Sequence, residues 1–256
     1  MEEYSKIITA TAAFIGAVAW PITALIVVLL FRRELQSALS KLPLMLDRVK
    51  KASIPGVAVE LERIADAEAE TDKDKGGKIT PKQIEAAARI EVQARVVGSD
   101  ELLRELDRLC LEYDSLRRAL PAGPDRTRAM TRLVVKMRSL APSVLDSLGI
   151  YKGSGSPGSR LAAITMMQMV PRVADLTWLG ERFSTEQQAF LLYHAALALQ
   201  NVANISETGA KRAILRRTAE EALRKVKSFP GIPDQGTVQA LEMLISSLPK
   251  HGSEQA

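Results

Sequence analysis

Few residues of this 256-residue chain have the types and spacing that chemistry requires. His194 needs a base partner, a nucleophile or further ligands before it can act in catalysis or bind a metal. The surrounding stretch, residues 190–201, has no carboxylate and no cysteine, so a buried structural histidine is the better interpretation. Cys110 is the single cysteine and lies in an apolar helical pattern, which indicates a small core residue. We expect no enzyme activity, no metal site and no cofactor.

Two runs of basic residues could bind phosphate groups of a nucleotide signal, a nucleic acid or a lipid. One repeats every fourth residue, and the other lies in the segment 206–227, where basic residues outnumber acids. The candidate basic face comprises Arg128, Arg132, Lys136, Arg212, Arg216 and Arg217. An ordinary solvated helix face is the alternative. No aromatic residues are interleaved to stack on bases, which argues against nucleic acid as a partner.

The elements that carry these residues begin with an uncharged run of 25 residues, residues 7–31. About 20 apolar residues suffice to cross a bilayer as a helix, so residues 1–33 are expected to form a transmembrane anchor. A cleaved signal peptide is the alternative, because Ala17-Val18-Ala19 has the form of a cleavage site. The leading MEEYSK is not basic, however, and the apolar run continues for twelve residues after Ala19.

Charge on either side of the run predicts its orientation. Residues 32–51 contain six basic side chains, whereas the six residues before the run contain one lysine and two acids. Because basic flanks stay in the cytoplasm, we expect a single-pass protein of the bacterial inner membrane with its N-terminus outside and its body in the cytoplasm. Membrane lipid is thus an expected partner, attracted in part by the basic flank.

The run also contains small residues that would let two helices approach closely. The candidate self-association residues are Ala12, Ala13, Gly16, Ala17 and Pro21. Either they mediate a homo-oligomer, in which the proline bends the helix, or the run is an anchor only.

The rest of the chain is expected to be all-α, with at most one short strand. Residues 34–65 read as a juxtamembrane amphipathic segment followed by a strand near residues 54–62, where apolar residues alternate after Pro55-Gly56. Residues 66–79 read as a linker. A capping box at Thr80–Gln83 opens a helical hairpin domain over residues 80–150, which contains a heptad-like leucine pattern and Pro142 as a predicted kink.

A helical domain over residues 159–248 and a tail over residues 249–256 complete the chain. A second capping box is expected at Ser184-Thr185-Glu186-Gln187, before an almost entirely apolar helix. The segments SRLAAITMMQMVPR and LLYHAALALQNVAN resemble HEAT-type or armadillo-type helical repeats. The segments DRTRAMTRLVVKMRSLA and FLLYHAALAL are similar to helical modules of bacterial membrane-anchored and conflict-system proteins. These resemblances imply a protein-binding scaffold rather than an activity.

Two functions therefore remain open. The first is a membrane-anchored, cytoplasm-facing scaffold or adaptor that binds a protein partner at the inner membrane as a homo-oligomer. The second is a membrane-perturbing effector of a bacterial antiphage defence system, triggered by a partner or signal.

Overall fold

The computed structural model describes residues 55–71, 77–206, 209–231 and 233–249, and within these ranges the chain is all-α. The predicted membrane anchor, residues 1–33, lies outside the described residues. Among the helices that are described, none combines the length and the apolar character that a membrane crossing needs.

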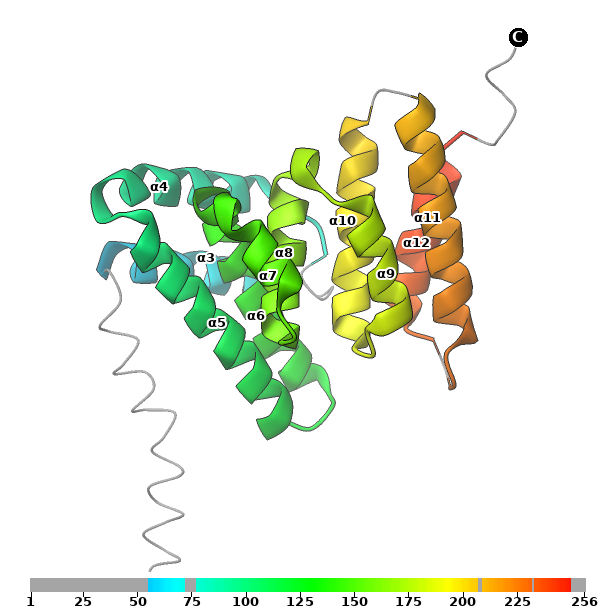
Figure 1. Ribbon diagram of the computed structural model, residues 1–256. Helices are drawn as coiled ribbons and strands as arrows, with labels where there is room; N and C mark the ends of the chain where they lie inside the picture. Colours follow the sequence, from blue (N-terminus) through cyan, green and yellow to red (C-terminus); the bar gives the residue numbers. More distant parts are fainter. Residues whose placement is uncertain (1–54, 72–76, 207–208, 232, 250–256) are drawn as a thin grey trace, which may run out of the picture. The chain divides into compact units, whose positions relative to one another are not determined.

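The first helices of the described part pack around α6, in which every residue from Met130 to Leu140 except Arg132 is buried. α3, α4, α5 and α8 all contact it, and Figure 1 shows α3 and α4 side by side. Their bounds are α3 Pro55–Thr71, α4 Pro81–Val97, α5 Ser99–Ala119 and α6 Pro124–Leu140. α5 and α6 pack against one another across their short connection, as the heptad-like pattern predicts.

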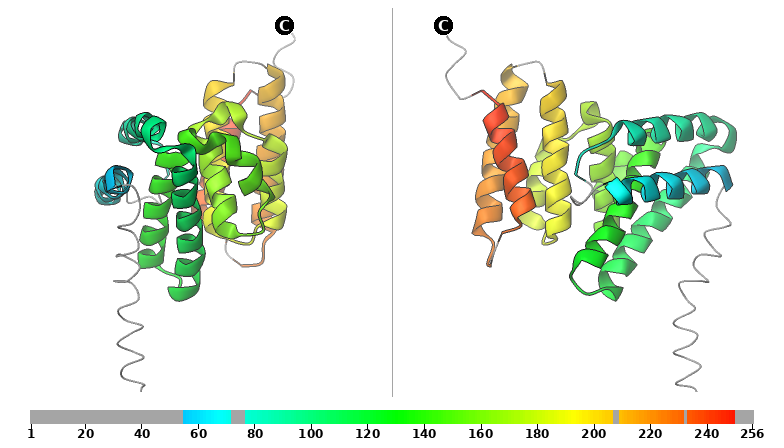
Figure 2. Two further views of the ribbon diagram at one scale, coloured as in Figure 1. Left: turned by 60° about the vertical axis from the view of Figure 1, so that its left-hand side comes forward. Right: turned by 180° about the vertical axis from the view of Figure 1, so that it is seen from behind.

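The later helices pack in sequence from α8 outward. α8 contacts α5, α6 and α10, and α10 in turn contacts α12, so these elements form successive layers (Figures 1 and 2). The bounds are η1 Ala141–Ser147, α7 Leu148–Gly153, α8 Pro157–Met169, η2 Pro171–Val173, α9 Leu176–Thr185, α10 Ala189–Ile205, α11 Gly209–Ser228 and α12 Gln235–Ser247. One continuous apolar cluster extends from Val57 to Leu248, so all the α-helices share one core.

The predicted strand near residues 54–62 is wrong, because these residues from Pro55 onward form the first half of α3. In a strand, Val57, Val59 and Leu61 would share one face. In α3, Val57 and Leu61 are buried while Val59 is 66% exposed. Burial at helical spacing against α6 outweighs three alternating residues, and a proline in the first turn suits a helix start. Six residues of the predicted linker, residues 66–71, also belong to α3.

Three local signals have different outcomes. The helix start at Thr80 is confirmed, since its Oγ1 accepts a 3.2 Å hydrogen bond from the Gln83 amide. The Gln83 side chain bonds to Glu68 and Arg138, however, so the reciprocal half of a capping box is not seen among the described residues. The kink expected at Pro142 is a full interruption, since α6 ends at Leu140 and a 3₁₀ segment follows. The second capping box is wrong, because Ser184 and Thr185 complete the last turn of α9.

The true start of α10 explains that error. Its N-cap residue is Gln188, whose side chain makes no capping hydrogen bond. The buried Glu186 turns inward instead, and its Oε1 accepts the amides of Gln187 and Gln188 at 3.0 and 3.2 Å. Its Oε2 accepts both Nε and Nη2 of Arg160. A tertiary ion pair with Arg160 and two local amides thus hold Glu186 between α9 and α10.

Candidate functional site

A network of buried polar side chains lies in the interior of the fold, around Arg138. This arginine is completely buried on α6. Its Nε donates a 2.8 Å hydrogen bond to Gln168 Oε1 on α8, and its Nη2 donates a 3.2 Å bond to the Gly77 carbonyl. Its Nη1 lies 3.4 Å from Gln83 Oε1 on α4. One guanidinium thus joins α6 both to α8 and to residues 77–83, which are distant from it in sequence.

The network continues from Gln83 to the end of α3. Gln83 Nε2 donates a 2.9 Å bond to Glu68 Oε2, and Thr80 Oγ1 donates a 2.8 Å bond to Glu68 Oε1. Glu68 is buried, so its carboxylate supplies the negative charge in the same interior region as Arg138. A buried charge that is bridged through hydrogen bonds to an opposite one is a stable arrangement, whereas an isolated one is costly.

His194 lies at the other end of this network and is completely buried on α10. Arg138 can only donate, so the Gln168 atom facing it is the amide oxygen and the amide nitrogen faces α10. That nitrogen donates a 2.6 Å bond to the His194 carbonyl and lies 3.4 Å from His194 Nδ1. Nδ1 is therefore the acceptor of this pair. The ring also packs edge-on to Phe190 at 4.6 Å between centroids.

Buried hydrogen bonds and ring packing describe a structural histidine, as the local sequence indicates. Among the described residues, no group of three or more His, Cys, Asp or Glu side chains is placed to hold a metal ion. Burial, together with the charge of Asp107, raises the pKa of the Cys110 thiol to about 12, so the thiolate needed of a nucleophile is scarce near neutral pH.

The first half of the predicted basic face is covered by α3. Lys136 is buried, and its Nζ donates a 2.5 Å bond to Glu62 Oε1. Arg132 reaches Glu62 at 3.2 Å and Asp66 at 2.5 Å. Arg128 is exposed, and among the described residues its one ion contact is with Asp125 of its own helix, at 3.6 Å. Two of these three cations therefore hold α3 on α6, and Arg128 stays apart from them.

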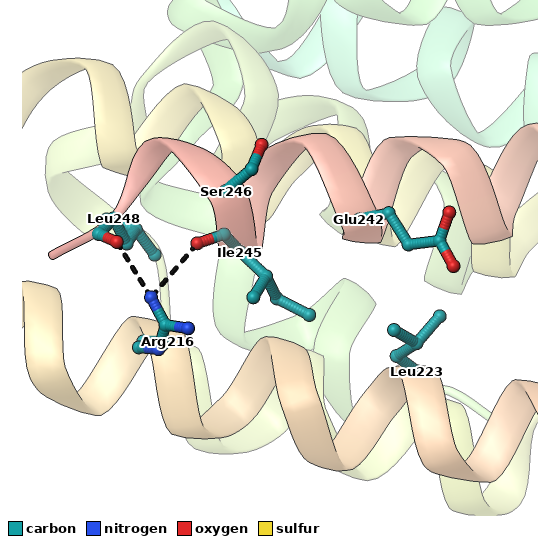
Figure 3. Close-up of a pocket in the computed structure, with 6 residues that line it drawn as sticks. All are labelled: Arg216, Leu223, Glu242, Ile245, Ser246 and Leu248. Atoms are coloured by element: carbon teal, nitrogen blue, oxygen red, sulfur yellow. Dashed lines mark hydrogen bonds between the residues drawn. The ribbon is translucent and has the colours of Figure 1, made fainter. Parts of the chain in front are cut away.

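The three arginines of the second half of the predicted basic face, on α11, also differ in their surroundings. Arg216 Nη1 donates to the carbonyls of Ile245 and Leu248 at 3.1 and 2.7 Å, so it caps the C-terminal end of α12 (Figure 3). Its Nε donates to Glu220 Oε1 at 2.8 Å. Arg217 is exposed, and Arg212 is half-buried. The structure does not bring the α6 and α11 cations together, because their helices do not pack on each other.

A hollow of about 220 Å³ lies between α11 and α12 beside this cap. Figure 3 shows the residues that line it. Its walls are apolar at Leu223, Ile245 and Leu248. Arg216 and Glu242 stand at its ends, and both are engaged: Glu242 Oε1 accepts a 2.8 Å bond from Lys227. The charges around this hollow are thus already satisfied within the fold.

A larger groove of about 440 Å³ lies between α9 and α11. Its wall on α9 is Gly180, Phe183 and Ser184, and its wall on α11 is Thr218, Glu221, Ala222, Arg224, Lys225 and Ser228. The two helices approach closely where a Cβ on Gly180 would lie 3.2 Å from Thr218 Cγ2. Arg224 and Lys225 are exposed, and neither pairs with an acid of the described residues. The groove is lined mostly by polar residues, with the buried Phe183 and Ala222 beneath them and two exposed cations along α11.

The chain was compared with protein families, curated proteins and solved structures. No protein-family model, no curated protein and no solved structure matches the chain.

Arg138, Gln83 and Gln168 were not singled out from the sequence. A signal was present for the arginine: it follows Val134 by four residues, on the face that also bears Leu133 and Met137. The glutamines carried no such signal. The candidate self-association residues Ala12, Ala13, Gly16, Ala17 and Pro21 lie outside the described residues.

Proposed function

We propose that the chain is a membrane-anchored, cytoplasm-facing helical scaffold or adaptor that binds a protein partner at the bacterial inner membrane as a homo-oligomer. The observation that carries the partner-binding role is the α9–α11 groove, which combines an apolar floor with two cations that have no acidic partner among the described residues. The uncharged run of residues 7–31 carries the anchoring role.

The groove fits a protein segment with one apolar anchor and a nearby carboxylate. Phe183 and Ala222 are buried and supply the floor. Arg224 and Lys225 stand at the rim with Glu221, leaving a net positive charge there. Lys225 also lies in the last turn of α11, where a cation complements the helix dipole. An apolar anchor in a pocket with a charged rim is the usual arrangement of a binding hot spot.

The HEAT-like character proposed for residues 159–248 supports the same role. Such repeats act by presenting grooves between helices, and α9 and α11 are neighbours within this part of the chain.

A photo-crosslinking amino acid at Ser184 in the full-length chain tests the groove. We expect a crosslinked partner that mass spectrometry identifies and that, once purified, binds the wild-type protein. Charge reversal of Arg224 and Lys225 to Glu should weaken this binding about tenfold or more, since both groove-lining positions would then repel the carboxylate of the proposed partner segment. Arg217→Glu is the matched control on the same helix, because Arg217 is exposed and does not line the groove. Equal loss in both variants would contradict the proposal.

The anchoring role is tested separately. The full-length protein should need detergent for extraction from membranes. A topology reporter fused to its C-terminus should show that this end lies in the cytoplasm. A freely soluble product, or a C-terminus outside the cell, would exclude it. The membrane-perturbing alternative predicts leakage on overexpression that disappears when Gly16 or Pro21 is replaced by Leu.

A further inference from the structure

We infer that the edge formed by α3 and α4 lies against the lipid surface of the membrane that anchors the chain, an inference that rests on the proposed anchoring. The partner groove lies between α9 and α11, so this edge is a second, separate interaction surface. Figure 2 shows α3 and α4 packed side by side.

The edge carries an apolar stripe that no described helix covers. On α4, Ile84, Ala88, Val92 and Val96 recur every fourth residue, which places them along one side of the helix. The three larger ones are 56%, 63% and 89% exposed, and Ala88 is exposed as well. α4 contacts its neighbours through its other side, where Gln83, Ala86, Ala87 and Ile90 are buried.

Arginines stand beside the stripe. Arg89 donates 3.0 and 2.8 Å bonds to Glu60 Oε1, and Arg63 donates to the same carboxylate, so both cations are fixed in position while staying exposed to solvent. Arg95 is exposed in the last turn of α4. The exposed Glu85 and Glu91 lie on the same helix, so the apolar stripe and its position carry the inference more than net charge does.

The chain enters the described fold at this edge. α3 begins at Pro55, and a Cβ on Gly56 would lie 3.7 Å from Gln93 Oε1, next to Val92 on α4. Twenty-three residues, 32–54, separate this point from the predicted span. A chain of that length cannot reach beyond about 80 Å, whatever its conformation. Such a tether holds the edge at a high effective concentration near lipid, where even a weakly apolar surface binds.

A second copy of the chain is the other occupant that such a stripe could take. A bilayer and a protein differ in one measurable respect: only the bilayer brings lipid acyl chains close to the stripe. An environment-sensitive fluorophore at Val92, with a lipid-borne quencher, therefore separates the two.

The experiment uses the full-length protein in liposomes, with Cys110→Ala to leave one label site. Val92→Cys carries the fluorophore, and Leu111→Cys is the matched control, because Leu111 is also a highly exposed apolar residue but lies on α5, away from this edge. We expect lipid-borne quencher to reduce the signal at Val92 at least about threefold more than at Leu111. The double substitution Ile84→Glu and Val96→Glu should abolish this difference.

Three results would overturn the inference. If the protein stays with the liposomes but the label at Val92 is as exposed to water as the label at Leu111, the lipid-facing edge is refuted and the anchoring is left intact. A label that is shielded from water but not quenched by lipid assigns the edge to a second copy. A full-length protein that does not remain with the liposomes refutes both the inference and the proposed anchoring.

Discussion

Gly158 lies directly against the backbone of Cys110, so close that a Cβ at residue 158 would sit 2.2 Å from the Cys110 carbonyl oxygen. The start of α8 is thereby pressed onto α5. Asp114, one turn further along α5, completes the contact: its Oδ1 accepts the Gly158 amide at 2.9 Å and its Oδ2 accepts the Ser156 hydroxyl at 2.5 Å. A carboxylate that accepts the first amides of a helix stabilises that end.

Gly158→Ala should therefore destabilise the fold by about 1–3 kcal/mol or more, because the clash involves backbone and cannot be relieved by a rotamer change. The measurement is urea unfolding of the detergent-solubilised full-length protein, followed by fluorescence. Gly155→Ala is the control, since no atom lies within 4 Å of a Cβ there, and it should change stability by less than about 0.5 kcal/mol. Similar values for the two variants would contradict this packing.

Replacement of Arg138 by Leu should cost about 3–5 kcal/mol, because Gln168 Oε1 and the Gly77 carbonyl would lose their donor and Glu68 its nearby cation. Unfolding of the same detergent-solubilised protein measures the loss. Arg128→Leu on the same helix removes an exposed cation with one long ion contact and should be nearly neutral. A small effect at Arg138 would show that the network is dispensable.

Glu60 should make stability depend on acid pH. The hydrogen bond from Arg63, followed by that from Arg89, holds the pKa of Glu60 below its ordinary value, despite partial burial. Its contribution is present above the unfolded pKa of about 4.3 and is lost as pH falls through the folded value.

Wild type should thus lose more stability than Glu60→Gln when pH is lowered from about 5 to about 3, by less than about 1 kcal/mol because the pair is near the surface. Glu91→Gln removes an exposed acid of α4 and should not change this pH dependence. Parallel curves for wild type and Glu60→Gln would refute the assignment.

Cys110 should resist alkylation in the folded protein. Its thiol is buried, and burial raises its pKa to about 12, whereas an ordinary cysteine has a pKa of about 8.5. Labelling by a maleimide at pH 8 should be at least about a hundredfold slower than in denaturant. Mass spectrometry of timed samples measures both rates, and a fast native rate would mean that this part of α5 opens readily.

Local patterns in the sequence predicted most of the helices, because each depends on residues within a few turns. The leucine steps of α5 and the hydroxyl of Thr80 are of this kind, and so is Pro142, near which α6 ends and a 3₁₀ segment begins. The same local reasoning failed at residues 54–62 and at Ser184, where a partner distant in sequence outweighed a short motif.

The sequence by itself thus determined an all-α chain with a buried His194 and a long uncharged run near its start. Only the tertiary structure decided which cations serve the fold and which remain available. Lys136 and Arg138 come from the same basic run as Arg128, yet α3 and α8 approach the first two and leave the third in solvent. Charge is a property of the residue, but its partner is set by the packing of helices far apart along the chain.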